Sequence, residues 1–136
     1  MNVIAEMLAE RSPGEIRVSV VVDYSGNLSI ILQKFGLKPD VSELTERDRD
    51  CAVSILTNLL WKDQAYGCER MQEDRARFFA EKIIEENECK NSRYFSNGSS
   101  IIQGSWYPFT DSTFDSGIVM SNGDGRYFCM WFEGED

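Results

Sequence analysis

The stretch Ile118-Val-Met-Ser-Asn-Gly-Asp-Gly-Arg-Tyr-Phe-Cys-Met-Trp-Phe132 decides the fold of this chain. It contains two runs rich in β-branched and aromatic residues, which favour strands. Between them stands Asn122-Gly123-Asp124-Gly125, and Asn-Gly and Asp-Gly are strong signals of a tight hairpin turn. The sequence therefore predicts two antiparallel strands joined at this turn.

Short β-type runs also occur upstream, at Tyr94-Phe95 and Ile101-Ile102, separated by Gly, Asn and Ser. Strands that follow one another closely along the chain usually pair with their sequence neighbours. We therefore expect the C-terminal part of the chain to form an antiparallel β-meander.

Two helices are expected before this meander, over residues 45–66 and 69–88. Ala52, Ile55, Leu56, Leu59 and Leu60 repeat at helical spacing, which is typical of one buried helix face. The second helix carries its apolar residues on one side and charges on the other. The two helices should pack together against the sheet, and the side chains expected in the core are Leu56, Leu59, Phe79 and Ile83. Thr45 is the expected N-cap of the first helix.

The N-terminal part predicts a short helix over residues 1–11, stopped by Ser12-Pro13-Gly14. Residues 16–22 and 28–33 are rich in apolar, β-branched residues and flank a turn at 24–27, so we expect a β-hairpin. Helices and strands thus come in blocks, which predicts one α+β domain spanning residues 1–136.

The composition restricts the function. There is no histidine, and 23 Asp and Glu face 14 Lys and Arg, for a formal charge of -9. Histidine is the usual acid and base at neutral pH and the commonest metal ligand. A charge of this sign repels nucleic acid and anionic membranes and attracts basic proteins. We therefore expect no catalysis, no cofactor, no small-molecule substrate, and neither nucleic acid nor membrane as a partner.

The four cysteines, at positions 51, 68, 89 and 129, lie too far apart for the paired spacing of zinc sites. We expect reduced thiols, no structural metal and no disulfide. Residues 1–12 lack the basic start and long apolar stretch of a secretory signal, so the expected location is the cytoplasm.

The richest segment for recognition runs from Trp106 to Gly117, where aromatic residues alternate with small polar residues and two aspartates. Trp and Tyr anchor protein interfaces, and carboxylates meet basic groups. The predicted partner-binding residues are Trp106, Tyr107, Asp111, Asp115 and Glu133. The competing interpretation is a packed loop whose aromatic residues fill the core and whose polar residues bond turn backbone.

The sequence offers two candidate metal sites, one in this segment and one at the hairpin turn. Asp111 and Asp115 could form a catalytic carboxylate pair that holds a metal ion. Asn122–Gly125 resembles part of a calcium loop, but Met120 and Trp131 stand where the first acid and the last Glu belong. The tight turn explains these residues better.

Acidic residues gather in three further stretches, at 43–50, at 81–88 and at the C-terminus. By size, charge and α+β order, the chain resembles the small acidic immunity proteins that neutralise bacterial nuclease toxins. The resemblance implies a tight complex with a basic toxin domain in the cytoplasm, and it transfers no residue roles. Two alternatives stay open: a phage-type inhibitor that mimics nucleic acid, and a histidine-free, metal-dependent hydrolase using Asp111 and Asp115.

Overall fold

The computed structural model describes residues 2–11, 15–97 and 108–134. Its elements are, in chain order, α1 (Val3–Glu10), β1 (Glu15–Val22), α2 (Leu28–Phe35), a 3-10 turn η1 (Val41–Glu43), β2 (Leu44–Arg47), α3 (Arg49–Trp61), α4 (Glu73–Asn87), β3 (Arg93–Asn97), β4 (Phe114–Ser121) and β5 (Arg126–Gly134). The predicted α+β class is confirmed.

The strands form one five-stranded antiparallel sheet in the order β1-β5-β4-β3-β2. The predicted C-terminal meander is confirmed for β3, β4 and β5, which pair in sequence order. The predicted run at Ile101-Ile102 lies outside the described residues. Gly123 and Gly125 have positive φ angles in the turn between β4 and β5. Such angles suit glycine, which has no Cβ to clash with the backbone.

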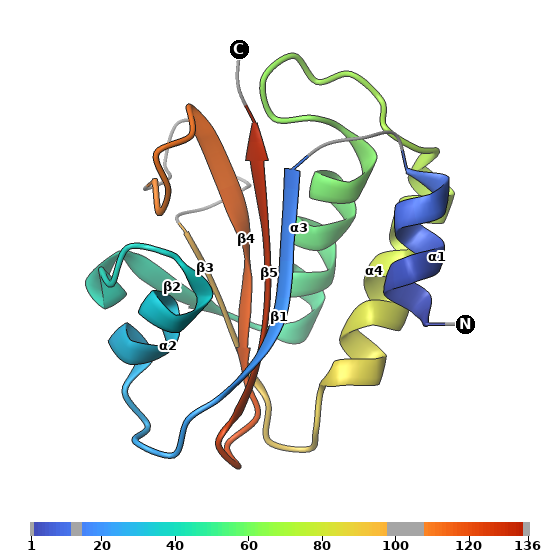
Figure 1. Ribbon diagram of the computed structural model, residues 1–136. Helices are drawn as coiled ribbons and strands as arrows, with labels where there is room; N and C mark the ends of the chain where they lie inside the picture. Colours follow the sequence, from blue (N-terminus) through green and yellow to red (C-terminus); the bar gives the residue numbers. More distant parts are fainter. Residues whose placement is uncertain (1, 12–14, 98–107, 135–136) are drawn as a thin grey trace.

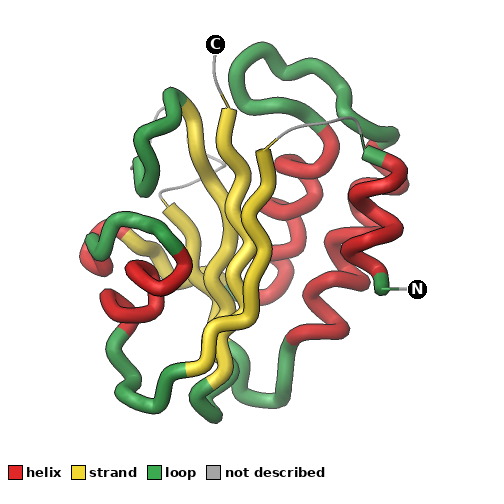
Figure 2. The backbone as a smooth tube through the Cα atoms, in the orientation of Figure 1, coloured by secondary structure: helices red, strands yellow, loops and turns green. Residues whose placement is uncertain are grey.

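The sheet is covered on both faces. In Figure 1, α1, α3 and α4 lie on one face and α2 lies on the other, and the tube in Figure 2 shows the same layers. Ile118 and Met130 belong to the core under the three helices, whereas Val119 and Trp131 belong to the core under α2. A strand buried on both faces needs apolar residues at every position, which explains the unbroken apolar run in β5.

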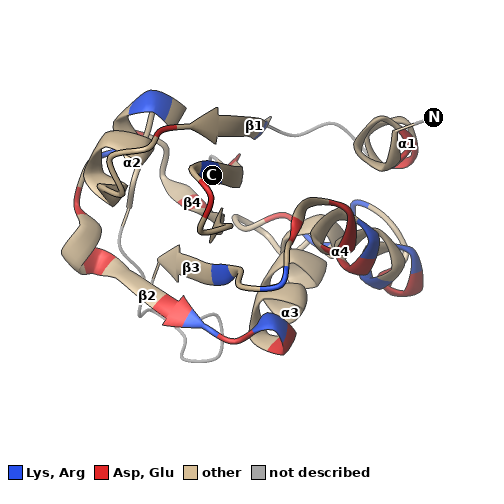
Figure 3. Ribbon diagram, turned by 90° about the horizontal axis from the view of Figure 1, so that it is seen from below, with Lys and Arg blue, Asp and Glu red and all other residues tan. Residues whose placement is uncertain are grey.

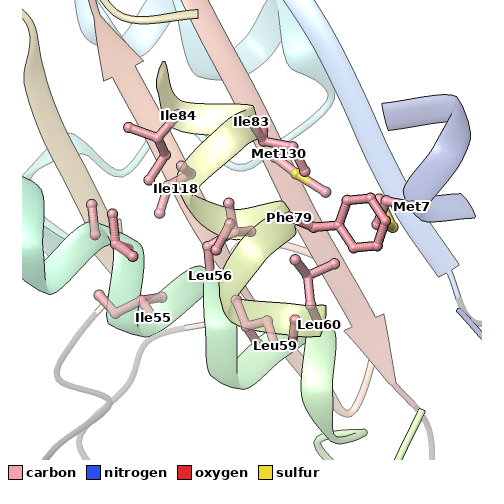
Figure 4. Packing of buried hydrophobic residues seen from close by; sticks show 14 of the residues in the cluster. Met7, Ile55, Leu56, Leu59, Leu60, Phe79, Ile83, Ile84, Ile118 and Met130 are labelled. Atoms are coloured by element: carbon pink, nitrogen blue, oxygen red, sulfur yellow. The ribbon is translucent and has the colours of Figure 1, made fainter. Parts of the chain in front are cut away.

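The larger core lies between the sheet and the α3–α4 pair. All four side chains predicted for it are buried, with exposed fractions of 0% for Leu56 and Ile83, 1% for Phe79 and 8% for Leu59. Figure 4 shows them pointing into the space between the two helices and the sheet. Met7 of α1 joins the same cluster. No helix in the described part of the chain is long and apolar enough to cross a membrane.

The predicted N-terminal hairpin is wrong in its second strand. Residues 28–35 form α2, and β1 pairs instead with β5 at the far end of the chain. Asn27 caps the helix by accepting a hydrogen bond from the Ser29 N–H, and Gly36 ends it with φ at 88°. The apolar residues Ile31, Leu32 and Phe35 are spaced to bury one helix face, and that spacing outweighs their tendency to form strands.

The predicted helix over 45–66 is also divided differently. Its first residues form the strand β2, paired with β3. The N-cap of α3 is Asp48, whose carboxylate accepts a hydrogen bond from the Cys51 N–H at 2.8 Å, and it replaces the predicted Thr45. The following helix begins at Glu73 instead of 69.

Candidate functional site

The predicted recognition loop enters the described structure at residue 108 and leads into β4. Trp106 and Tyr107, the predicted aromatic anchors, lie outside the described residues. The remaining predicted residues, Asp111, Asp115 and Glu133, lie at the end of the sheet where β4 starts and β5 stops. Their environments differ sharply.

Asp115 is buried, with 1% of its surface exposed. One carboxylate oxygen accepts hydrogen bonds from the Phe109 N–H and the Trp131 indole N–H, both at 3.0 Å. The other accepts from the Thr110 N–H at 3.0 Å and from the Thr110 hydroxyl at 2.8 Å. We call Asp115 with these donors the loop anchor. A buried carboxylate is tolerable because four donors replace the water it has lost.

The loop anchor supports the packed-loop interpretation. Phe109 has no exposed surface, and its ring packs edge-on against Trp131 at a centroid distance of 5.5 Å. Its carbonyl accepts a hydrogen bond from the Lys38 N–H, which ties the loop to the end of α2. The Asp115 carboxylate therefore holds its own loop in place, and its predicted role in binding a partner stays a prediction.

Glu133 is also committed to the fold. Both of its oxygens accept hydrogen bonds from the Arg17 guanidinium, at 2.8 and 3.1 Å, and one also accepts from the Ser112 hydroxyl at 2.9 Å. Its side chain is 8% exposed. Burial acts to raise the pKa of Glu133, but the hydrogen bonds from Arg17 and Ser112 outweigh it and hold the pKa below its usual value.

Asp111 is the exposed member of this set. Its neighbour in the predicted carboxylate pair, Asp115, faces inward with its oxygens occupied by donors. Within residues 2–11, 15–97 and 108–134, no group of three or more Cys, Asp or Glu side chains is placed to hold a metal ion.

Two hollows flank the end of β5 and share Ser112 and Glu133 in their walls. The helix-side hollow, of about 260 Å³, also contains Arg11, Lys62 and Arg70. The loop-side hollow, of about 480 Å³, lies on the α2 side of the sheet and is lined by these residues: Arg17, Gly36, Leu37, Lys38, Phe109, Thr110 and Asp111, besides the shared pair. The two hollows are thus lined by five basic residues together with three acids, Asp63, Asp111 and Glu133.

Arg11 uses its charge within the fold. Its guanidinium donates to the carbonyls of Leu59 and Leu60 at 3.0 Å, and it lies over the Phe132 ring at 5.4 Å. A cation at the last carbonyls of α3 complements the negative end of the helix dipole. Burial, together with the nearby Arg70, lowers the pKa of Arg11 to about 10, so it stays charged at neutral pH and acts as a structural cap.

The opposite end of the molecule gathers acids instead. Arg49, at the start of α3, donates to both Glu88 oxygens at 2.9 and 3.0 Å and to Glu81 at 3.2 Å. This links two acidic stretches that are distant in sequence. We call the resulting surface the acidic corner, and it consists of Glu46, Asp48, Asp50, Glu81, Glu85 and Glu88. Seen from below in Figure 3, the charges at the end of β2 and the start of α3 lie side by side.

Some members of the acidic corner are fixed and others are free. Glu46 pairs with Arg93 at 2.7 Å. Asp50 and Glu85 are exposed and make no hydrogen bond or ion pair with another described residue. Glu85 follows Glu81 by four positions, so helix geometry places both on one face of α4, and Glu88 is the C-cap residue directly after this helix. The sequence showed these acids as separate stretches, and the packing of α3 against α4 was the missing link.

Ionisation in the acidic corner is set by its hydrogen bonds. Burial acts to raise the pKa of Glu88, but the bonds from Arg49 and Tyr94 outweigh it, and the net shift is downward. The pKa of Arg49 is raised, chiefly by its bond to Glu88. Burial and the bond to Glu88 raise the pKa of Tyr94 to about 12. Glu88 is therefore ionised at neutral pH, and Arg49 and Tyr94 keep their protons.

The four cysteines do not form a cluster at either end of the molecule. All four are free thiols; Cys129 is buried between the sheet and α2, and burial raises its pKa to about 12. A thiol with such a pKa is protonated and unreactive at neutral pH. Cys68 is the exposed one.

Comparisons with protein families, with curated proteins and with solved structures found no match for this chain.

Proposed function

We propose that this protein is an inhibitor of the immunity type, which binds and neutralises a basic, nuclease-type toxin domain. The observation that carries the proposal is the acidic corner, where the fold unites two acidic stretches on a chain of net charge -9. Complementary charge accelerates the encounter of two proteins and rejects partners of the wrong sign. Binding alone accounts for this role, and no catalytic step is part of it.

The corner suits this role because its framework is pre-organised. Arg49 holds Glu81 and Glu88, and Arg93 holds Glu46, so these carboxylates are fixed before a partner arrives. Ordering side chains on binding costs free energy, and a pre-organised surface avoids part of that cost. Asp50 and Glu85 remain available to form new ion pairs with lysines and arginines of a partner.

The predicted loop has a smaller role in this proposal than the sequence suggested. Asp115 and Glu133 are bound within the protein, which leaves Asp111 as the loop acid that can face a partner. Trp106 and Tyr107 stay predicted anchors. The acidic corner and Asp111 lie at opposite ends of the molecule, so charge reversal at each site will show which end binds.

The test uses a purified, catalytically inactive basic nuclease-type toxin domain as the probe, with association followed by stopped-flow fluorescence. We expect Asp50→Lys and Glu85→Lys to slow association by about tenfold at low ionic strength, and less at high salt. Glu69→Lys is the matched control, since it makes the same charge change at an exposed site near the other end. Asp111→Lys reports on the loop.

Two outcomes would count against the proposal. The first is a toxin-type domain that is neither bound by the protein nor neutralised in cells that co-express both. The second is binding whose rate is unaffected by salt and by the Asp50 and Glu85 variants. A large effect of Asp111→Lys with none at the corner would keep the function and move the interface to the loop.

A further inference from the structure

The two edges of the sheet are built differently. The β2 edge is four residues long, and its exposed side chains are Thr45 and Glu46. The β1 edge is eight residues long and exposes Val20 and Val22, at 57% and 48%. Natural sheets protect their edges by keeping them short or charged. The β2 edge follows this rule, whereas β1 presents a long apolar edge, visible as the outermost strand beside α1 in Figure 1.

The backbone of β1 has groups that point away from the sheet. The Asp23 N–H donates to the Gly125 carbonyl at 2.8 Å, in line with the register of β1 against β5. In an antiparallel pair, residues alternate between those that bond the neighbour and those that point outward. Positions 17, 19, 21 and 23 therefore bond β5, and the outward set is Ile16, Val18, Val20 and Val22.

We propose that β1 pairs with β1 of a second copy of this chain, antiparallel and with the two-fold axis at Val20. The two sheets then become one continuous sheet. In this register Val20 faces its own counterpart, and Val18 faces Val22 of the second copy. All of these positions have outward N–H and carbonyl groups, so both strands satisfy each other. The Lys34 ammonium donates to the Val22 carbonyl and the Ser19 hydroxyl to the Val20 carbonyl, each at 3.4 Å, but a carbonyl oxygen can accept a second hydrogen bond.

Complementary charges favour a second copy of this chain as the partner of β1, and they also favour this register. The same alignment places Arg17 directly opposite Asp23 of the second copy, on the sheet face away from the valines, and it does so twice by symmetry. Within one chain Arg17 binds Glu133 and Asp23 binds Lys34. The Arg17 side chain is still 39% exposed, so the pairing would join four alternating charges across the axis.

The net charge of -9 opposes this association, because two copies repel each other. Salt screens this long-range repulsion more than it weakens hydrogen bonds, apolar contacts and the close, partly buried Arg17–Asp23 pairs. The dimer should therefore strengthen with salt, whereas binding to a basic toxin domain should weaken. Because β1 and β2 are opposite edges of the sheet, the acidic corner stays open in the dimer, and the two proposals can fail separately.

Sedimentation equilibrium of the full chain tests the pairing. We expect a reversible dimer whose dissociation constant falls as salt rises. Val20→Lys places two ammonium groups opposite each other at the axis and should weaken the dimer by about tenfold or more. Phe78→Lys is the control, since it changes a 42% exposed apolar residue on α4 by the same charge. It should leave the dimer unchanged.

Amide hydrogen exchange gives a residue-level test. In the dimer, the outward amides at 18, 20 and 22, which face strand residues of the second copy, should gain protection as the protein concentration rises. The amides at 17, 19 and 21 should be protected at every concentration. A chain that stays monomeric up to about 1 mM would overturn the proposal. So would a dimer that Val20→Lys leaves intact, or one that weakens with salt.

Discussion

Carboxylates at the two ends of this molecule differ in burial and in their hydrogen-bond partners. At the loop anchor, Asp115 is 1% exposed and accepts four hydrogen bonds from its own fold. At the acidic corner, Asp50 and Glu85 are exposed and bond no other described residue. The difference shows that an acidic residue close to aromatic residues in the sequence does not have to bind a partner. Burial decides whether a carboxylate stabilises the fold or remains available to a partner.

The largest effect should come from the loop anchor. Asp115→Asn keeps the shape of the side chain but turns an amide NH₂ toward groups that are themselves donors. We expect a loss of about 3 kcal/mol in the free energy of unfolding, because charged hydrogen bonds are lost and buried donors are left unsatisfied. Urea denaturation measures it. Asp111→Asn, on the exposed side of the same loop, should stay within about 0.5 kcal/mol of the wild type. Equal effects of the two variants would contradict the comparison.

A smaller loss should follow from removing a single donor of the anchor. Trp131→Phe deletes the indole N–H that Asp115 accepts and keeps an aromatic ring near Phe109. We expect the free energy of unfolding to fall by about 2 kcal/mol, the range for one hydrogen bond to a charged group together with lost contact. In the Asp115→Asn background this change should cost less, because the bond it removes is already impaired. Additive losses would show that the two residues act independently.

The sequence predicted the parts of the fold that depend on local pattern. The turn at Asn122–Gly125 and the buried faces of α3 and α4 follow from short-range spacing, and the structure has all three. The strand predicted over residues 28–33 is wrong, because Ile30 and Ile31 favour strands locally but lie in α2. The helical cap at Asn27 and the glycine at 36 were the signals that could have corrected this.

Long-range pairing was beyond what pattern alone can supply. β1 pairs with the last strand of the chain, and nothing within residues 15–22 indicates which strand will lie beside them. The same limit applies to the candidate site: its acidic residues could be predicted from the sequence, but their hydrogen-bond donors could not. Asp115 and Glu133 stood out as acids near aromatic residues, but their donors Trp131 and Arg17 come from other strands. Likewise Arg49 joins the acidic stretches of the corner only once α3 and α4 are packed.

At the acidic corner, the ion pairs should contribute modestly to stability. Arg49→Gln removes the bonds to Glu81 and Glu88, and we expect a loss of about 1 kcal/mol at neutral pH, since the pairs are partly exposed. The folded pKa of Glu88 lies below its ordinary value of 4.5. Its contribution is therefore present above that value and is lost as pH falls through the folded pKa. The difference between wild type and variant should shrink on acidification, and a difference that grows would contradict the assignment.

The smallest effect on stability should come from the free acids of the corner. Asp50 is exposed and bonds no other described residue, so Asp50→Lys should change the free energy of unfolding by no more than about 0.5 kcal/mol. Its position in the first turn of α3 makes the change slightly unfavourable, because a cation there opposes the helix dipole. Asp50→Asn separates the two contributions, since it removes the charge without reversing it. Thermal denaturation and urea titration of both variants measure this change in the free energy of unfolding directly.

A variant with wild-type stability and slowed binding to a basic domain would mark Asp50 as a residue that serves partner binding. A loss above about 2 kcal/mol would show that the corner, like the loop anchor, serves the fold instead.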